Sequence, residues 1–498
     1  MGANPSALDA GRAPGNHASI RRKSAQGIAI NMTAQAFRFG LQFVVSIVMA
    51  RLLGPSEFGL LAMAAPLIAF VALFADLGLS QATVQRPEIS QAQLSLIFWT
   101  SALVSVTSGV IVMLGAPLAS IFYGEPRVQS VLVALGAILM LTGFYNQHVA
   151  LLNRRLAFGS LVAVDLGSYT LSSIAGISAA LLGFSYWSLV ISQATLTISA
   201  LVLAWSLARW VPSRPGKAPE AREILGFGGN VTGFNIFNYF ARNLDNVLIG
   251  RTLGEVQLGI YDRAYKLLLL PLSQITGPIA KVATPLLSRL DQDREKYRRS
   301  YLMLLETVIL LTYPSILVTG VASQLVIYTV LGAKWYAVAP IFQVLAIGAL
   351  FAPVSNSTGW LFTTQNRTRE MRNYGLLSSL AFVASFVVGL PWGIQGVANA
   401  YIATGCVQGP LLWYAATRRG PITFNALLRA LIPYALGAIV TSGTVWLSAR
   451  YLAASWTNVV LLLAIGHLVF WVTVAATPRG RATLNTLLDE GRRLMRRS

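Results

Sequence analysis

The chain has 498 residues, of which 55% are hydrophobic and only 11% are charged, and its net charge is +20. Soluble proteins carry about 25% charged residues, so this composition excludes a water-soluble globular protein. The single cysteine, Cys406, excludes a disulfide or a thiolate metal cluster within one chain. The three histidines contain no pair at metal-ligand spacing, and we expect no metal site and no bound cofactor.

The apolar segments predict an all-α membrane protein of about fourteen transmembrane helices with short connections, because a helix needs about 20 apolar residues to cross a bilayer. The first segment follows the basic residues Arg21, Arg22 and Lys23 and is too long for the apolar region of a signal peptide. The spans are predicted at 26–52, 58–85, 94–122, 128–152, 158–182, 186–209, 224–250, 256–284, 299–330, 337–363, 373–391, 394–416, 427–449 and 456–476.

The basic residues in the connections predict the orientation. If the N-terminus is cytoplasmic, 27 of the 38 Lys and Arg residues lie in the tails or in cytoplasmic connections. The opposite connections hold Arg51, Arg127, Arg251, Lys334 and Arg450. Because cytoplasmic loops are enriched in Lys and Arg, both termini are expected in the cytoplasm. The positive charge then faces anionic membrane lipid, and its spread over many short loops argues against nucleic-acid binding.

A repeated motif indicates two homologous lobes, the arrangement of many alternating-access transporters. It consists of an arginine at the end of one helix and two glycines around the start of the next, and it recurs at an offset of 200 residues. We expect a structural role for its members, which are Arg51, Gly54, Gly59, Arg251, Gly254 and Gly259. The predicted organisation is a cytoplasmic basic tail at 1–23, an N-lobe of six helices at 24–210, a cytoplasmic linker at 211–223, a C-lobe of six helices at 224–417, two extra helices at 418–476 and a cytoplasmic basic tail at 477–498.

Charged side chains inside apolar spans are candidates for function, because hydrocarbon tolerates them only beside a partner or water. Arg38 lies near the middle of the first span and has no charged neighbour there. Arg242 and Asp245 share one face of the seventh span, and Asp262 and Lys266 share one face of the eighth. Internal ion pairing is the alternative to a ligand site for each of them.

Together with Arg263, these positions carry four cations and two anions, and the surplus suits an anionic ligand such as a pyrophosphate. The predicted substrate-binding residues are Arg38, Arg242, Arg263 and Lys266. The predicted counter-ions or ion-coupling residues are Asp76, Asp245 and Asp262, with a proton or sodium gradient as the coupling to consider. A solvated or paired role is expected for Asp165 and Glu306, and a helix-packing role for His148.

The chain shows no Gly-rich phosphate loop, no Ser–His–Asp set that can be placed together and no long non-cytoplasmic loop, which favours transport over catalysis. The segments Ala50–Gly59 and Ala75–Ala82 resemble those of bacterial polysaccharide flippases in the multidrug/oligosaccharidyl-lipid/polysaccharide exporter superfamily, and colanic-acid and exopolysaccharide exporters look most similar. Gly250–Gly254 and Gly259–Tyr261 match the same pattern in the second half. The resemblance covers roughly residues 24–476.

This resemblance implies two six-helix lobes plus two extra helices, with spans 1, 2, 7 and 8 around a central cavity. The implied activity is translocation of an undecaprenyl-pyrophosphate-linked oligosaccharide across the bacterial cytoplasmic (inner) membrane, for exopolysaccharide, capsule or lipopolysaccharide synthesis. Polysaccharide polymerase and chain-length proteins are the implied partners.

Three alternatives are open at this point. A multidrug or cation exporter on the same fold would favour an acidic cavity. A membrane glycosyltransferase would turn over sugar nucleotides, and a non-transporting scaffold of a polysaccharide assembly complex would tolerate loss of the buried charges.

Overall fold

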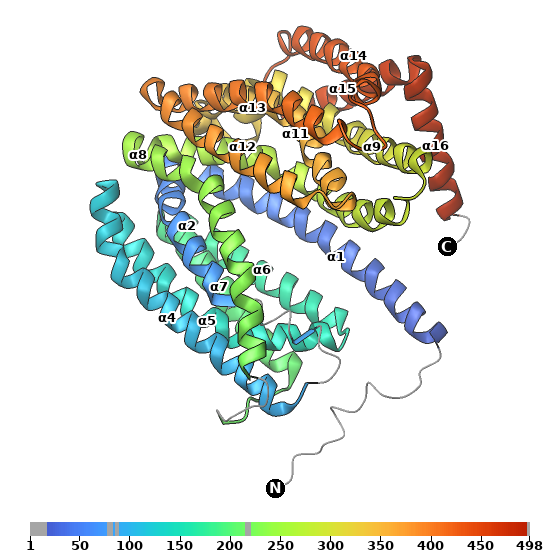
Figure 1. Cartoon of the computed structure of the whole chain (residues 1–498). Helices are drawn as coiled ribbons and strands as arrows, with labels where there is room; N and C mark the ends of the chain where they lie inside the picture. Colours follow the sequence, from blue (N-terminus) through green and yellow to red (C-terminus); the bar gives the residue numbers. More distant parts are fainter. Residues whose placement is uncertain (1–16, 77–82, 85–88, 215–220, 496–498) are drawn as a thin grey trace. The chain divides into compact units, whose positions relative to one another are not determined.

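The computed structural model describes residues 17–76, 83–84, 89–214 and 221–495, and the elements among them are helices (Figure 1). This confirms the predicted all-α class. The helices group into two compact units, Met1–Asn243 and Leu244–Ser498, which we call unit 1 and unit 2. The lobe and linker boundaries expected from the sequence stay predictions.

Unit 1 is built from long helices in antiparallel hairpins. They are α1 (His17–Leu52), α2 (Pro55–Asp76), α4 (Gln91–Tyr123), α5 (Arg127–Arg154), α6 (Phe158–Leu181) and α7 (Trp187–Ala208). In this unit α4 pairs with α5, α6 pairs with α7, and α1 packs on α6. The start of α4 is a capping box, in which Ser90 Oγ accepts from Gln93 N at 3.2 Å and Gln93 Oε1 accepts from Ser90 N at 2.9 Å.

Small residues allow α4 and α5 to approach closely. A Cβ atom on Gly143 would overlap the Ser105 hydroxyl and the Ser101 backbone oxygen. Ser105 Oγ instead donates to the Met140 carbonyl at 3.1 Å and accepts from Gly143 N at 3.2 Å. Such small-residue contacts with interhelical hydrogen bonds are how helices associate in a membrane, where lipid is as apolar as leucine.

Outside the spans, the short connection between α4 and α5 contains an ion pair. Glu125 Oε1 accepts from Arg127 Nε at 2.8 Å, and Glu125 Oε2 accepts from Arg127 Nη2 at 2.9 Å. These bonds lower the pKa of the Glu125 carboxyl below its ordinary value.

The repeated motif coincides with helix junctions in both halves. Gly54 lies between α1 and α2, and its N–H donates to Glu57 Oε2 at 3.0 Å. Gly254 interrupts α8 (Ala221–Arg289) with φ 84° and ψ 178°, close to the gap predicted between 224–250 and 256–284. Only glycine adopts this backbone conformation without strain. The second glycines, Gly59 and Gly259, are buried, whereas the motif arginines are exposed.

Unit 2 contains the remaining helices. They are α8 from residue 244 onward, α9 (Arg294–Val321), α10 (Ser323–Leu331), the 3-10 helix η2 (Ala333–Trp335), α11 (Val338–Thr364), α12 (Thr368–Gly389), the 3-10 helix η3 (Leu390–Trp392), α13 (Gly393–Thr417), α14 (Phe424–Ala449), α15 (Trp456–Ala476) and α16 (Pro478–Met495). A buried aromatic core around Tyr297, Tyr301, Trp360 and Phe470 joins α9 to α11 and α15.

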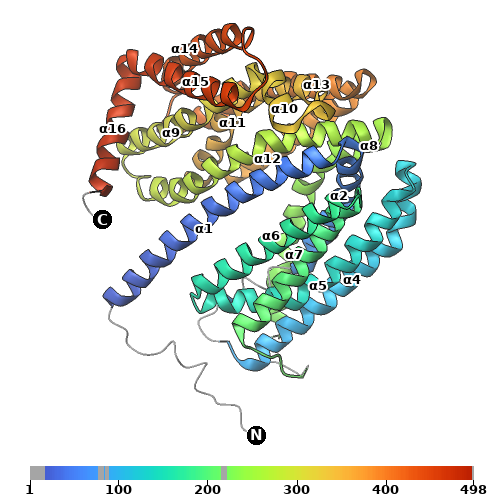
Figure 2. The same cartoon turned by 180° about the vertical axis from the view of Figure 1, so that it is seen from behind.

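The C-terminal segment expected as a basic tail contains helix α16, which follows α15 in both views (Figures 1 and 2). Its residues Gly480 and Thr483 are buried, and Leu484 and Leu487 pack against the core of unit 2. These positions recur at helical spacing, so α16 is amphipathic and one face of it is docked.

The described residues contain 11 helical segments long and apolar enough to cross a membrane, or 12 when a bent pair in α8 counts as one span. One of the 11, Thr368–Thr417, includes both α12 and α13. The region predicted as one span at 299–330 is divided into α9 and α10, because the helix ends at Ala322. The chain is a multi-pass membrane protein, and the number of fourteen spans stays a prediction.

Candidate functional site

In unit 1, Arg38 of α1 has a partner that the sequence did not reveal. Arg38 Nη1 donates to Asp165 Oδ1 of α6, and the guanidinium carbon lies 5.8 Å from the centroid of the Tyr169 ring. Asp165 and Tyr169 are one helical turn apart and share one face of α6. Their four-residue spacing is visible in the sequence and indicates a shared polar face on α6. Only the packing of α1 on α6 shows that this face meets Arg38.

The Arg38–Asp165 pair is accessible. The exposed fractions of the two side chains are 41% and 49%. Neither side chain is therefore enclosed by the helices of unit 1, although each holds the other in an ion pair.

In unit 2, Asp245 is buried and hydrogen-bonded. Tyr261 donates through its hydroxyl to Asp245 Oδ2 at 3.2 Å, and Asn246 N donates to Oδ1 at 2.8 Å. Tyr261 is itself buried and follows Gly254 in the chain, so the break in α8 separates the two partners. The predicted partner Arg242 lies outside the described side chains, as does Asp76. Sequence reasoning assigned no role to Tyr261, although it follows the repeated motif directly.

Asp262 and Lys266 form the internal ion pair that the sequence left open as the alternative to a ligand site, with Lys266 Nζ 2.9 Å from Asp262 Oδ2. Asp262 is buried, whereas the Lys266 side chain is 57% exposed. Between them, buried Arg263 places its guanidinium carbon 5.5 Å from the centroid of the Trp335 ring. A desolvated cation–π contact of this kind stabilises a buried guanidinium.

The structure changes the charge count of the predicted set. Asp165 was expected to be solvated or paired, and the structure makes it a partner of Arg38. Counted along the sequence, the four predicted cations and the three anions Asp245, Asp262 and Asp165 leave a positive surplus of one rather than two. An anionic ligand at Arg38 would therefore displace an internal carboxylate.

Other polar residues also have partners within their own unit. Buried His148 approaches the Trp210 carbonyl through Nε2 at 3.2 Å and stacks on Trp205 at a centroid distance of 4.3 Å, as expected for a packing residue. Glu306, expected to be solvated or paired, is buried and accepts hydrogen bonds from Arg479. In the part of the chain that the structure describes, no group of three or more His, Cys, Asp or Glu residues could hold a metal ion.

Comparison with known proteins gives consistent similarities. The family described as polysaccharide biosynthesis protein matches residues 48–340. The lipopolysaccharide biosynthesis protein WzxC of Escherichia coli (strain K12) is 26% identical over 378 residues, covering 74% of this chain and 76% of that protein. The succinoglycan biosynthesis transport protein ExoT of Rhizobium meliloti (strain 1021) is 23% identical over 476 residues, covering 91% of this chain and 92% of that protein.

Among solved structures, the lipid II flippase MurJ in an inward closed conformation is similar, with a TM-score of 0.71 at 14% identity. The similarity covers 90% of this chain and 98% of that one. An inward-facing multidrug resistance transporter of the MATE family gives a TM-score of 0.61 at 15% identity, covering 80% of this chain and 99% of that one. At this identity both similarities show a shared fold.

Proposed function

Because the chain belongs to the polysaccharide biosynthesis protein family, we propose that it translocates a lipid-linked oligosaccharide across the bacterial cytoplasmic membrane. Relatives named for polysaccharide biosynthesis and transport cover most of the chain, which supports a glycan substrate. The fold shared with a lipid II flippase supports movement of a lipid-linked molecule. The proposed substrate is an undecaprenyl-pyrophosphate-linked repeat unit of an exopolysaccharide, capsule or lipopolysaccharide.

At the level of residues, the proposal rests on Arg38, a half-exposed cation in the apolar helix α1. Its guanidinium, held by Asp165 and Tyr169, can grip a pyrophosphate through paired planar donors. We propose that Arg38, Arg242, Arg263 and Lys266 contact the pyrophosphate in different steps of alternating access. The protein then moves its substrate without chemistry and without a resident metal or cofactor.

We propose Asp245 as the residue that couples transport to a proton or sodium gradient. Asp76 and Asp262 are proposed as counter-ions of the cationic binding residues. Two observations support this role. Asp245 is buried, and the Tyr261 hydroxyl, which follows the helix break at Gly254, donates a hydrogen bond to it. A change of charge on Asp245 alters that hydrogen bond and so bears directly on the geometry of the break.

The proposed orientation places both termini in the cytoplasm, and the proposed partners are the polymerase and chain-length proteins of the same pathway. Cation export on the same fold is the second candidate, favoured by the buried carboxylates of Asp245 and Asp262. The substrate distinguishes the two, because a cation exporter would transport organic cations and leave lipid-linked glycan in its original leaflet.

The proposal is tested by leaflet-resolved transport of a lipid-linked glycan in proteoliposomes. Arg38→Ala removes a charged hydrogen-bond donor worth about 1.5–3 kcal/mol, so the rate should fall by a factor of about ten or more. Lys281→Ala is the matched control, because Lys281 is an exposed cation in an apolar helix and is not among the proposed binding residues. Wild-type transport in Arg38→Ala, Arg242→Ala and the double variant would refute the binding assignment. Absence of transport by the wild-type protein would refute the function.

A further inference from the structure

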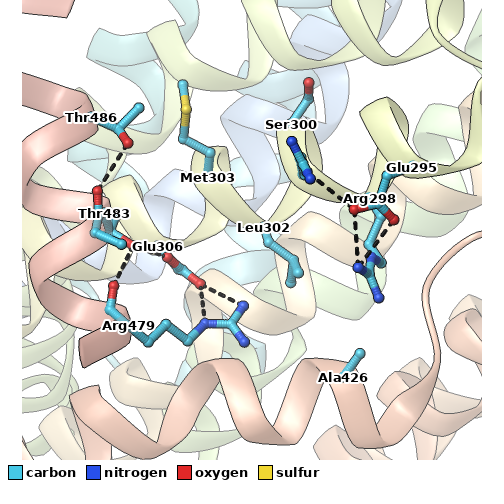
Figure 3. Close-up of a pocket in the computed structure, with 12 residues that line it drawn as sticks. Glu295, Arg298, Ser300, Leu302, Met303, Glu306, Ala426, Arg479, Thr483 and Thr486 are labelled. Carbon is cyan, nitrogen blue, oxygen red and sulfur yellow. Dashed lines mark hydrogen bonds and ion pairs between the residues drawn. The ribbon is translucent and has the colours of Figure 1, made fainter. Parts of the chain in front are cut away.

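A pocket of about 620 Å³ lies in unit 2, and none of the residues that line it is among those proposed for transport (Figure 3). One face of α9 forms the first wall and α16 forms the second. Ala426, in the first turn of α14, closes one side. The volume falls in the usual range for small-molecule sites, roughly 300–1,000 Å³. It is lined by Glu295, Arg298, Arg299, Ser300, Leu302, Met303, Glu306, Ala426, Arg479, Ala482, Thr483 and Thr486.

At one end of this pocket, the charge of Glu306 is neutralised by a buried ion pair with Arg479. Buried Glu306 accepts from Arg479 Nε at 3.0 Å and from Arg479 Nη2 at 2.9 Å through one oxygen, and from Thr483 Oγ1 through the other. These bonds tie α16 to α9 and build the wall. Because Glu306 is neutralised by Arg479, it does not oppose an anion at the other end of the pocket.

The opposite end carries two arginines that share one carboxylate. Arg298 Nη2 lies 3.0 Å from Glu295 Oε2, and Arg299 Nε lies 3.1 Å from Glu295 Oε1. Among the described residues, Arg299 donates only through Nε, and its side chain is 79% exposed. Its terminal amino groups are therefore available, and this end of the pocket has one positive charge in excess.

Between the two ends the lining is apolar. Figure 3 shows Leu302 between the Glu306–Arg479 pair and the Glu295–Arg298 pair, and Met303 and Ala482 add further apolar surface. A free phosphate would use only the arginines. An amphiphile with an anionic head and an acyl chain would use both parts of the pocket.

The position of the pocket also favours a lipid. The last turn of α8, the connection and the first turns of α9 carry Arg289, Arg294 and Lys296 in addition to the pocket arginines, against Asp291, Asp293 and Glu295, so residues 289–299 have a net charge of +2. Basic pockets between membrane helices on the cytoplasmic side bind anionic head groups, and the cytoplasmic leaflet supplies them. The choice of a lipid rests on the proposed cytoplasmic location of this end of α9 and does not depend on the proposed substrate.

We propose that this pocket binds one anionic phospholipid, with the phosphate at Arg298 and Arg299 and an acyl chain along Leu302 and Met303. In this arrangement the bound lipid lies between α9 and α16, which form the two walls of the pocket. It is a resident ligand of unit 2, separate from the translocated molecule.

The test measures binding of dioleoyl phosphatidylglycerol to the purified full-length protein by native mass spectrometry, with dioleoyl phosphatidylcholine as the neutral reference lipid. Arg298→Gln/Arg299→Gln should weaken phosphatidylglycerol binding about tenfold or more, since each basic residue near the head group adds to affinity. The matched control is Arg294→Gln/Lys296→Gln, which removes the same charge from the same turns of α9 outside the pocket. Because neither side chain lines the pocket, this control should weaken binding clearly less than the pocket variant does. Arg298→Lys/Arg299→Lys, which keeps the charge, should bind at an intermediate level.

Each contrary result overturns the proposal. Equal weakening in both glutamine variants would mean general attraction to a basic surface. Displacement of the lipid by inorganic phosphate at a similar concentration would assign the site to a free anion. Stronger binding of undecaprenyl pyrophosphate would assign it to the transported class of lipid. Elution of each variant as a monodisperse peak with the wild-type melting temperature shows that it is folded, and transport assays on the same variants keep this test separate from that of the proposed function.

Discussion

At the scale of single residues, the charged side chains inside the helices fall into two groups. Some have a partner within the same helical turn, and others have a partner far away along the chain. Asp262 and Lys266 are four residues apart, so helix geometry alone predicts their pairing. Arg38 and Asp165 are 127 residues apart, and no local pattern connects them. The donor to Asp245 lies 16 residues away beyond a helix break, and it was missed for the same reason.

The Asp245–Tyr261 contact gives a prediction at this scale. Tyr261→Phe removes the hydroxyl that donates to a buried carboxylate, and leaving such a group short of a partner costs about 1–3 kcal/mol. The melting temperature of the purified protein in detergent should fall. Tyr336→Phe removes the same hydroxyl from an exposed side chain and should leave the melting temperature unchanged. Equal melting temperatures for both variants would contradict the inferred contribution of this hydrogen bond.

At the scale of elements, the repeated motif has two forms. Its first glycine follows a complete helix at Gly54, but at Gly254 it interrupts a helix with φ 84°. The sequence repeat located both junctions, because glycine after a long apolar run favours a helix end. The difference in backbone conformation depends on the neighbouring helices and was not readable from the motif.

This difference predicts unequal effects of the same substitution. Gly254→Ala forces a side chain into a left-handed conformation, which costs about 1–2 kcal/mol, and should lower thermal stability. Gly54→Ala is the matched control, since the added Cβ would meet only the Glu57 carboxylate at 3.2 Å and the φ angle of Gly54 is not positive. Thermal unfolding of both variants in detergent measures the effect. A larger loss in Gly54→Ala than in Gly254→Ala would contradict the inference.

At the scale of the whole molecule, hydropathy predicted the helical membrane class that the structure shows. Every predicted span overlaps a helix, because the length of an apolar segment is a local property. The docking of α16 was not predicted. Its apolar face meets the core of unit 2 through Leu484 and Leu487, and amphipathicity alone fits a lipid surface equally well.

The orientation inferred from loop charge can be tested on the whole molecule. In a Cys406→Ala background, Asp291→Cys lies in an expected cytoplasmic connection and Ala454→Cys in an expected periplasmic one, and both positions are exposed. A membrane-impermeant maleimide should label Ala454→Cys in spheroplasts, and Asp291→Cys only after permeabilisation. Reversed labelling would contradict the orientation, and labelling of both positions in sealed spheroplasts would contradict the span count between them.

The sequence by itself determined the membrane class, the approximate helices, the internal repeat and the family, because hydrophobicity, helix periodicity and glycine junctions are local in the chain. Only the tertiary structure decided which charges are paired. Arg38 meets Asp165 because α1 packs on α6, and Glu306 meets Arg479 because α16 folds back onto α9. These contacts join residues more than a hundred positions apart, and their energies depend on burial, which no local pattern specifies.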